Sequence, residues 1–269
     1  MLRPPAVAGQ FYPSNPQELS ALVARLTSLE ILESKKQVKA CIVPHAGYMY
    51  SGAVAGAVFG SIQLPKRILL LGVRHFPRGE ELAVNSAGAW RTPLGDVAID
   101  EELATQLRRE CRLLREDTAA HSREHSLEVE LPFLQCLDPG FSFVPVAVGT
   151  LNFDALAQTG QGVARVLRKS PEEILVVTSS DMNHYEDDAT TKSKDRMAIE
   201  CLLKMDAEGL YEVCRREKIS MCGLGPSIVM LTAMNALGAR QAELIAHETS
   251  GDVTGERDSV VGYAGMVFA

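Results

Sequence analysis

Short aliphatic runs that alternate with amphipathic segments are the feature that most constrains how this chain can fold. The runs cover residues 39–45, 67–73, 141–149 and 173–181, and they are nearly continuous in Val, Ile and Leu. Strands of this kind are buried on both faces, and the helices between them pack on both sides of a mostly parallel sheet. We therefore predict an α/β fold in three layers, α/β/α, with a mixed, mostly parallel central sheet.

The segments between these runs have the helical spacing of apolar residues. The expected helices cover residues 52–62, 101–111, 153–169, about 190–205, 207–217 and 226–237. Two further strands are expected at 242–250 and 260–269, and a β excursion at 82–100. Because no linker, repeat or low-complexity tract interrupts the pattern, we expect a single domain over residues 1–269.

The composition argues against several classes of function. The net charge is −7 and no block of Lys or Arg occurs, so the electrostatic footprint of a nucleic-acid-binding protein is missing. No apolar run is long enough to span a bilayer, and residues 1–19 lack the apolar core of a signal peptide. None of the six cysteines has CxxC spacing, and a chain of 269 residues is too large to need a disulfide framework, so we do not expect one. We expect a cytoplasmic protein that binds neither nucleic acid nor membrane.

Histidines stand where the predicted strands end. His45 ends the first run, His75 follows the second, and Asp181 and His184 lie at the end of the run at 173–181. Ligands of open α/β sheets bind outside the carboxyl ends of the strands. One such histidine alone is as readily structural, but three at equivalent strand ends favour a functional site at one edge of the sheet.

Cys222 precedes a predicted helix, because Pro226 fits the first helical position and the neighbouring glycines allow a tight approach. A cysteine just ahead of a helix N-terminus has a lowered pKa, and its thiolate is both a nucleophile and a metal ligand. The alternative is a buried, inert cysteine beside a glycine-rich turn. This segment taken alone favours that alternative.

A further histidine, His125, lies in the segment 117–137. Its i, i+3 spacing from Glu128 predicts one shared helix face, where the pair can act as acid and base or support a metal ligand. A solvated helix start explains the same pattern equally well. We expect His121 and His247 to be structural.

Two neutral imidazoles and a thiolate form a suitable three-ligand metal site with an open position. Zinc, iron and copper all accept these ligands. An open position leads to hydrolysis on zinc, and to coordination of O2 or substrate on Fe(II). Without a metal, Cys222 can instead act as a nucleophile with a histidine base. The spacing of the residues does not decide among these, and no P-loop, GxGxxG or GxSxG motif is present.

Seven motifs occur in order along the chain. They are "AGQFYPS" (8–14), "PHAGYMYSG" (44–52), "LLGVRHF" (70–76), "RTPLGDVAID" (91–100), "EHSLEVELPF" (124–133), "SSDMNHY" (179–185) and "CGLGP" (222–226). Together they resemble the Memo family, whose microbial members are called AmmeMemoRadiSam system protein B. This family is similar in fold to class III extradiol dioxygenases of the LigB type, so the resemblance implies a LigB-like mixed sheet between helical layers.

The resemblance also implies roles for the candidate residues. The implied metal ligands are His45, His75 and Cys222, and the implied catalytic residues around the pocket are His125, Asp181 and His184. One of the two catalytic histidines would transfer protons, and the aspartate would orient a histidine or a bound water. Fe(II) is the expected cofactor, with copper or zinc as alternatives.

The sequence departs from the family pattern around the second histidine, where "GVRHF" replaces a segment closer to "GPSHH". Arg74 adds a cation there that could attract a carboxylate or phosphate. A cysteine also replaces the dioxygenase carboxylate, so ring cleavage is not inherited from the fold. We expect a metal-dependent, dioxygenase-like oxidoreductase that acts on a small molecule or a peptide. A non-catalytic protein that binds metal or a phosphopeptide is the alternative, with Arg74 and Arg91 as anion donors, and a zinc hydrolase or cysteine-nucleophile enzyme ranks third.

Overall fold

The computed structural model describes residues 1–28 and 35–269, and its central feature is a mixed sheet. Its middle consists of parallel strands in the spatial order β2 (Ala40–Val43), β9 (Ile174–Ser179), β3 (Arg67–Val73) and β8 (Ser142–Val148). Antiparallel strands flank this middle, namely β12 (Val260–Phe268) beside β2 and β4 (Leu82–Val84) beside β8. The outer strands are β10 (His184–Glu186) and β11 (Ala242–Thr249), which both pair with β12, and β7 (Arg115–Glu116), which pairs with β4.

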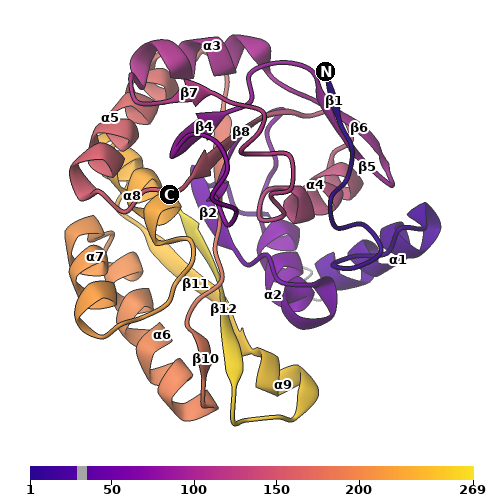
Figure 1. The fold of residues 1–269 in the computed structure, drawn as a ribbon, viewed down its shortest axis with the longest axis vertical. Coiled ribbons are helices and arrows are strands. Elements are labelled where there is room, and N and C mark those ends of the chain that lie inside the picture. Colours follow the sequence, from indigo (N-terminus) through magenta and orange to yellow (C-terminus); the bar gives the residue numbers. More distant parts are fainter. Residues whose placement is uncertain (29–34) are drawn as a thin grey trace.

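Helices cover both faces of this sheet, as Figure 1 shows. On one side lie α1 (Pro16–Thr27), α2 (Tyr48–Ser61) and α4 (Leu131–Leu137). On the other lie α3 (Glu101–Glu110), α5 (Phe153–Lys169), α6 (Asp188–Leu203), α7 (Ala207–Arg216) and α8 (Leu224–Ala236). The remaining elements are short: a small sheet of β1 (Leu2–Arg3), β5 (Ala89–Thr92) and β6 (Gly95–Ala98), the 3-10 turn η1 (Glu128–Glu130), and α9 (Ser250–Thr254). The predicted α/β/α layering and mixed, mostly parallel sheet are confirmed.

Successive residues of the central strands enter two different hydrophobic clusters. Ile42 and Leu69 pack with the helices α3 and α5–α8. Cys41, Val43 and Leu70 pack with α1, α2 and α4. Both faces of each strand are therefore buried, which explains why the strands are continuous in Val, Ile and Leu instead of alternating with polar residues.

Two helices begin earlier than the sequence pattern predicts. Helix α2 begins at Tyr48, not at residue 52, so the helix starts soon after His45. Helix α8 begins at Leu224, which makes Pro226 its third residue and not its first. The predicted β excursion is present as the antiparallel pair β5 and β6.

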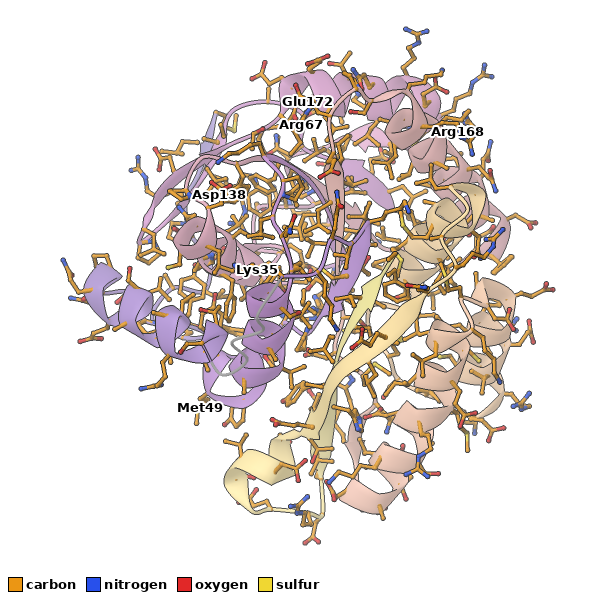
Figure 2. All side chains as sticks on the ribbon, turned by 180° about the vertical axis from the view of Figure 1, so that it is seen from behind. Lys35, Met49, Arg67, Asp138, Arg168 and Glu172 are labelled. Atoms are coloured by element: carbon orange, nitrogen blue, oxygen red, sulfur yellow. The ribbon has the colours of Figure 1, made fainter. Side chains whose placement is uncertain are left out.

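Three neighbouring strands bring their carboxyl ends to one place. β2, β9 and β3 end at Val43, Ser179 and Val73 and lie side by side in that order. The amino-terminal end of β3 lies at the opposite edge of the sheet, where Arg67 is beside Glu172. Figure 2 shows both residues far from Met49, which lies in the first turn of α2. Within the part of the chain that the structure describes, no helix combines the length and the apolar character needed to cross a membrane.

Candidate metal centre

Three histidine side chains meet at the carboxyl ends of these strands. His45, His75 and His125 each offer one ring nitrogen, and the three nitrogens lie within 4.8 Å of one another. The ring centroids of His75 and His125 are 4.6 Å apart with nearly parallel planes, and His45 presents an edge to both at 5.2 and 5.5 Å. Imidazole is a common ligand of zinc, copper and iron, so this donor set fits a single metal ion.

The strand ends place two of these histidines. His45 lies two residues beyond the end of β2 and His75 lies two residues beyond the end of β3. The third arrives on a loop that packs closely on β3 at Gly72, where an added Cβ would lie 2.5 Å from the side chain of Leu127. The hydroxyl of Ser126 accepts a hydrogen bond from the backbone N–H of Val73 at 3.0 Å, which fixes this loop to the end of β3. His125 is thereby held over His75.

Glu124 supports His75 with a buried carboxylate. Its oxygens lie 2.8 Å from Nδ1 of His75 and accept from the backbone N–H groups of His75 at 2.7 Å and Ser126 at 2.9 Å. Burial acts to raise the pKa of Glu124, but the hydrogen bond and charge of His75 outweigh burial and hold that pKa at about 2. The ionised carboxylate accepts the Nδ1 proton, so Nε2 of His75 is left as a lone-pair donor.

His45 and His125 are neutral for a different reason. Burial, assisted by the positive charge that His75 carries when protonated, lowers the pKa of His45 to about 3. Burial likewise lowers the pKa of His125 to about 4, assisted by His45. A neutral imidazole has a free lone pair, so both rings are in the state that binds a metal at neutral pH.

Cys222 lies beside His45 at the edge of the cluster. Its Sγ is 3.3 Å from Nε2 of His45 and 3.3 Å from the backbone N–H of Asp181, which donates to it. The close approach requires Gly223, because an added Cβ there would collide with Ser180. Burial raises the pKa of the Cys222 thiol, and the charge of Asp181 raises it further. The lowered pKa expected from the helix start is therefore wrong for this site without a metal.

Asp181 and His184 complete the surroundings of the cluster. The carboxylate of Asp181 accepts from the backbone N–H of His45 at 2.8 Å, and burial raises the pKa of Asp181. His184 donates its backbone N–H to the Ser220 hydroxyl at 2.8 Å, and its Nδ1 lies 3.0 Å from the Ser220 carbonyl oxygen. A carbonyl only accepts, so Nδ1 of His184 carries the proton and Nε2 can act as a base.

Comparison with known proteins gives a consistent family assignment. The family model described as Memo-like protein matches residues 3–267. The chain belongs to the Memo-like family. A MEMO1 family protein of Methanopyrus kandleri is 39% identical over 280 residues, which cover 100% of this chain and 99% of that protein. A MEMO1 family protein of Aquifex aeolicus is 38% identical over 268 residues, which cover 99% of each chain.

The fold of this Memo-like chain also occurs in a solved structure of low sequence identity. The crystal structure of an uncharacterized protein from Escherichia coli K12 has a TM-score of 0.57 to this chain and is 14% identical to it. The match covers 86% of this chain and 99% of that one. At this identity the similarity shows the fold alone, and it agrees with the α/β/α architecture.

In this Memo-like structure, one predicted pairing is wrong. His125 precedes the turn η1 and shares no helix face with Glu128. Glu128 instead forms a buried ion pair with Arg3 at 2.7 Å and accepts a hydrogen bond from the Tyr12 hydroxyl. Sequence spacing suggested the wrong glutamate, because Glu124 is the one that reaches the histidines.

The other polar residues singled out in the sequence have partners outside the histidine cluster. Nδ1 of His121 lies 2.8 Å from the Asp117 carbonyl oxygen, and His247 pairs with Asp195 at 2.8 Å. Arg74 donates to the Gly79 carbonyl oxygen at 3.0 Å. Arg91 forms a two-point ion pair with Asp96 across the hairpin of β5 and β6, so its charge is already matched.

Three residues that support this Memo-like site are not among the site residues predicted from the sequence. They are Glu124, Ser179 and Glu130. The Ser179 hydroxyl lies 2.7 Å from Nδ1 of His45 and 3.0 Å from a carboxyl oxygen of Glu130. Ser179 and Glu124 each stand at the first position of a family motif, "SSDMNHY" and "EHSLEVELPF", which is the only signal in the sequence that could have indicated them.

Proposed function

We propose that this protein holds one metal ion in the histidine cluster and acts as a mononuclear non-haem oxidoreductase, with Fe(II) as the favoured metal. The observation that carries the proposal is the approach of three imidazole nitrogens within 4.8 Å. Burial keeps two of these imidazoles neutral. A carboxylate behind the third, His75, orients the ring and raises its basicity, as in many metal sites.

Each residue has a defined part in this proposal. His45 and His75 are metal ligands, and the third ligand is either His125 or Cys222, which both lie beside His45. A bound ion would supply one-electron chemistry and an open position for substrate or O2. His184, with its free Nε2, would take up or release a substrate proton. Asp181 would keep the His45 backbone in place.

The function is tested by anaerobic reconstitution. We expect protein purified without oxygen to bind about one Fe(II) per chain by elemental mass spectrometry. His75→Ala should lose this iron, whereas His184→Gln should retain the iron and lose turnover. Oxygen uptake with a panel of catechols and other small phenols then measures the activity. Iron that binds equally well to His75→Ala, or the lack of iron-dependent uptake with any substrate, would contradict the proposal.

The third ligand is decided by two further variants. His125→Ala and Cys222→Ser are compared by Fe(II) competition against a chelator. We expect the ligand variant to weaken binding by roughly 10–100-fold and the other variant mainly to change turnover. A thiolate-to-metal charge-transfer band in the copper-loaded protein would assign the role to Cys222. If both variants bound Fe(II) as tightly as wild type, the ion would have to lie elsewhere.

Binding without turnover is a second candidate, and two exposed side chains favour it. Met49 and Tyr185 are 69% and 77% exposed. Met49 lies in the first turn of α2, shortly after His45, and Tyr185 directly follows His184. Exposed apolar side chains beside a functional site suit the docking of a peptide. Saturable peptide binding that His45→Ala abolishes, together with retained metal and no oxygen uptake, would favour this candidate over the oxidoreductase.

A further inference from the structure

Three glutamates between residues 124 and 130 are completely buried, and two of them have partners that stabilise a negative charge. Glu124 contacts His75, and Glu128 forms an ion pair with Arg3. Glu130 differs from both, because it forms no ion pair within residues 1–28 and 35–269 and one of its carboxyl oxygens, Oε2, makes no hydrogen bond there. A buried, unpaired carboxylate is strongly disfavoured, so Glu130 requires an explanation.

The hydrogen bonds around Ser179 supply one. Its Oγ lies 2.7 Å from Nδ1 of His45, 2.6 Å from the carbonyl oxygen of Ser126 and 3.0 Å from Oε1 of Glu130. The hydroxyl has a single proton, and the Ser126 carbonyl can only accept. If Glu130 were an anion, it would compete with that carbonyl for the one proton, and one of the two buried acceptors would be left unpaired.

A protonated Glu130 removes this conflict. Ser179 then donates to the Ser126 carbonyl and accepts from both the Glu130 carboxyl and Nδ1–H of His45. All three short contacts become hydrogen bonds with a donor and an acceptor, which buried polar groups require. Nε2 of His45 then carries no proton, and its lone pair faces Sγ of Cys222 at 3.3 Å.

The other titratable groups that face Glu130 agree with a neutral acid. They are Asp181, Tyr48 and Cys41, and none of them is a cation. Burial raises the pKa of Glu130 well above its ordinary value. A hydrogen bond donated by Ser179 to an ionised Glu130 would oppose this rise in pKa, whereas the charge of Asp181 adds to it.

We propose that Glu130 is a neutral carboxylic acid that donates to Ser179 and so positions His45 with Nε2 facing the cluster. Glu130 is a positioning residue, since it acts through Ser179 and touches neither the cluster nor a substrate. The protonation of Glu130 stands independently of any metal. Only its consequence for metal binding rests on the proposed function.

Infrared difference spectra of the metal-free protein test the protonation directly. At neutral pH, wild type minus Glu130→Gln should show the C=O stretch of a protonated carboxyl group. The matched control is Glu128→Gln, a buried glutamate two residues away that is ion-paired with Arg3, which should show only carboxylate bands. Loss of carboxylate bands alone in Glu130→Gln would overturn the proposal.

Fe(II) competition against a chelator, under anaerobic conditions, tests the positioning. Glu130→Gln keeps a donor for Ser179 and should bind Fe(II) within about twofold of wild type. Glu130→Leu removes the donor and should weaken binding by roughly 10–100-fold. If Glu130→Gln weakens binding as much as Glu130→Leu, or if Glu130→Leu binds normally, the positioning role is wrong. A wild-type chain that binds no Fe(II) would refute the proposed function and leave the infrared result standing.

Discussion

His75 and His45 bring ring nitrogens to the same cluster, but their other nitrogens rest on different supports. Behind His75 lies Glu124, whose carboxylate also accepts from two backbone N–H groups. Behind His45 lies the hydroxyl of Ser179, which in turn contacts Glu130. His75 lies at the rim of the molecule, whereas His45 is buried.

The difference shows how a buried site can orient two ligands without accumulating charge. A carboxylate behind a histidine fixes the tautomer and makes the ring a stronger donor, but it adds a negative charge. Asp181 and Glu124 already place two carboxyl groups near the cluster, and a further buried anion would have a large desolvation cost. A hydroxyl orients His45 without that charge. The two supports should therefore respond differently to mutation and to pH.

Removal of the charged support should have the largest effect. Glu124→Ala leaves the buried N–H groups of His75 and Ser126 without their acceptor, so we expect a loss of roughly 3–5 kcal/mol in the free energy of unfolding. Metal affinity should fall by about 100-fold, because His75 loses its orientation. Urea unfolding and chelator competition measure these two quantities. The control is Glu81→Ala on the exposed surface, which should change stability by less than about 0.5 kcal/mol. If Glu124→Ala and Glu81→Ala had equal effects, Glu124 would not be a support of the site.

Removal of the neutral support should have a smaller effect. Ser179→Ala takes a partner from Nδ1 of His45, from Glu130 and from the Ser126 carbonyl, but it leaves no unpaired charge. We expect a loss of about 2 kcal/mol in stability and about tenfold in metal affinity. Ser227→Ala is the matched control, because the Ser227 hydroxyl is also buried and makes no hydrogen bond to the residues described here. If Ser179→Ala is more damaging than Glu124→Ala, the contrast between the two supports is wrong.

The strand ends of the site could be predicted from the sequence, and their supports could not. Continuous aliphatic runs identified β2, β3 and β9, and parallel neighbours necessarily end at one edge of a sheet, so the meeting of His45 and His75 followed from the pattern. The supports depend on contacts between segments about 50 residues apart in the chain, such as Ser179 with Glu130 and His75 with Glu124. Spacing within one segment has no information about such contacts.

Local spacing was misleading for the same reason. His125 and Glu128 have the separation of helix neighbours, yet the turn η1 begins only at Glu128, and Ser126 is hydrogen-bonded to the end of β3. Glu128 is drawn instead to Arg3, 125 residues away in the sequence. Glu124 and Glu130 form part of the supports of His75 and His45 through contacts with distant segments, and the close packing of this loop on Gly72 is part of an arrangement that no periodicity encodes.

The neutral imidazoles should make the metal-free protein sensitive to acid. The folded pKa of His125 is about 4, below its ordinary value of about 6.5. As the pH falls below 6.5 the unfolded chain takes up a proton that the folded chain does not, so the free energy of unfolding decreases until the pH passes the folded pKa. His125→Gln lacks this proton and should lose about 1 kcal/mol less than wild type between pH 6 and pH 5 in urea unfolding with a chelator present. Identical losses would mean that His125 is not kept neutral by burial.

The contribution of Glu130 to the free energy of unfolding should depend on pH with the opposite sign to that of His125, and should be at most about as large. Burial raises the folded pKa of Glu130, so both states carry the proton below its ordinary pKa and the stabilisation is complete there. As the pH rises above that value the unfolded chain releases the proton and the folded chain keeps it, so the free energy of unfolding decreases until the folded pKa is passed. As the pH rises from 5 to 6, the free energy of unfolding of Glu130→Gln should therefore gain at most about 1 kcal/mol relative to wild type. His125→Gln gains relative to wild type only when the pH falls. A gain by Glu130→Gln on acidification instead would mean that Glu130 is ionised, and His45 would then rest on a charged support just as His75 does.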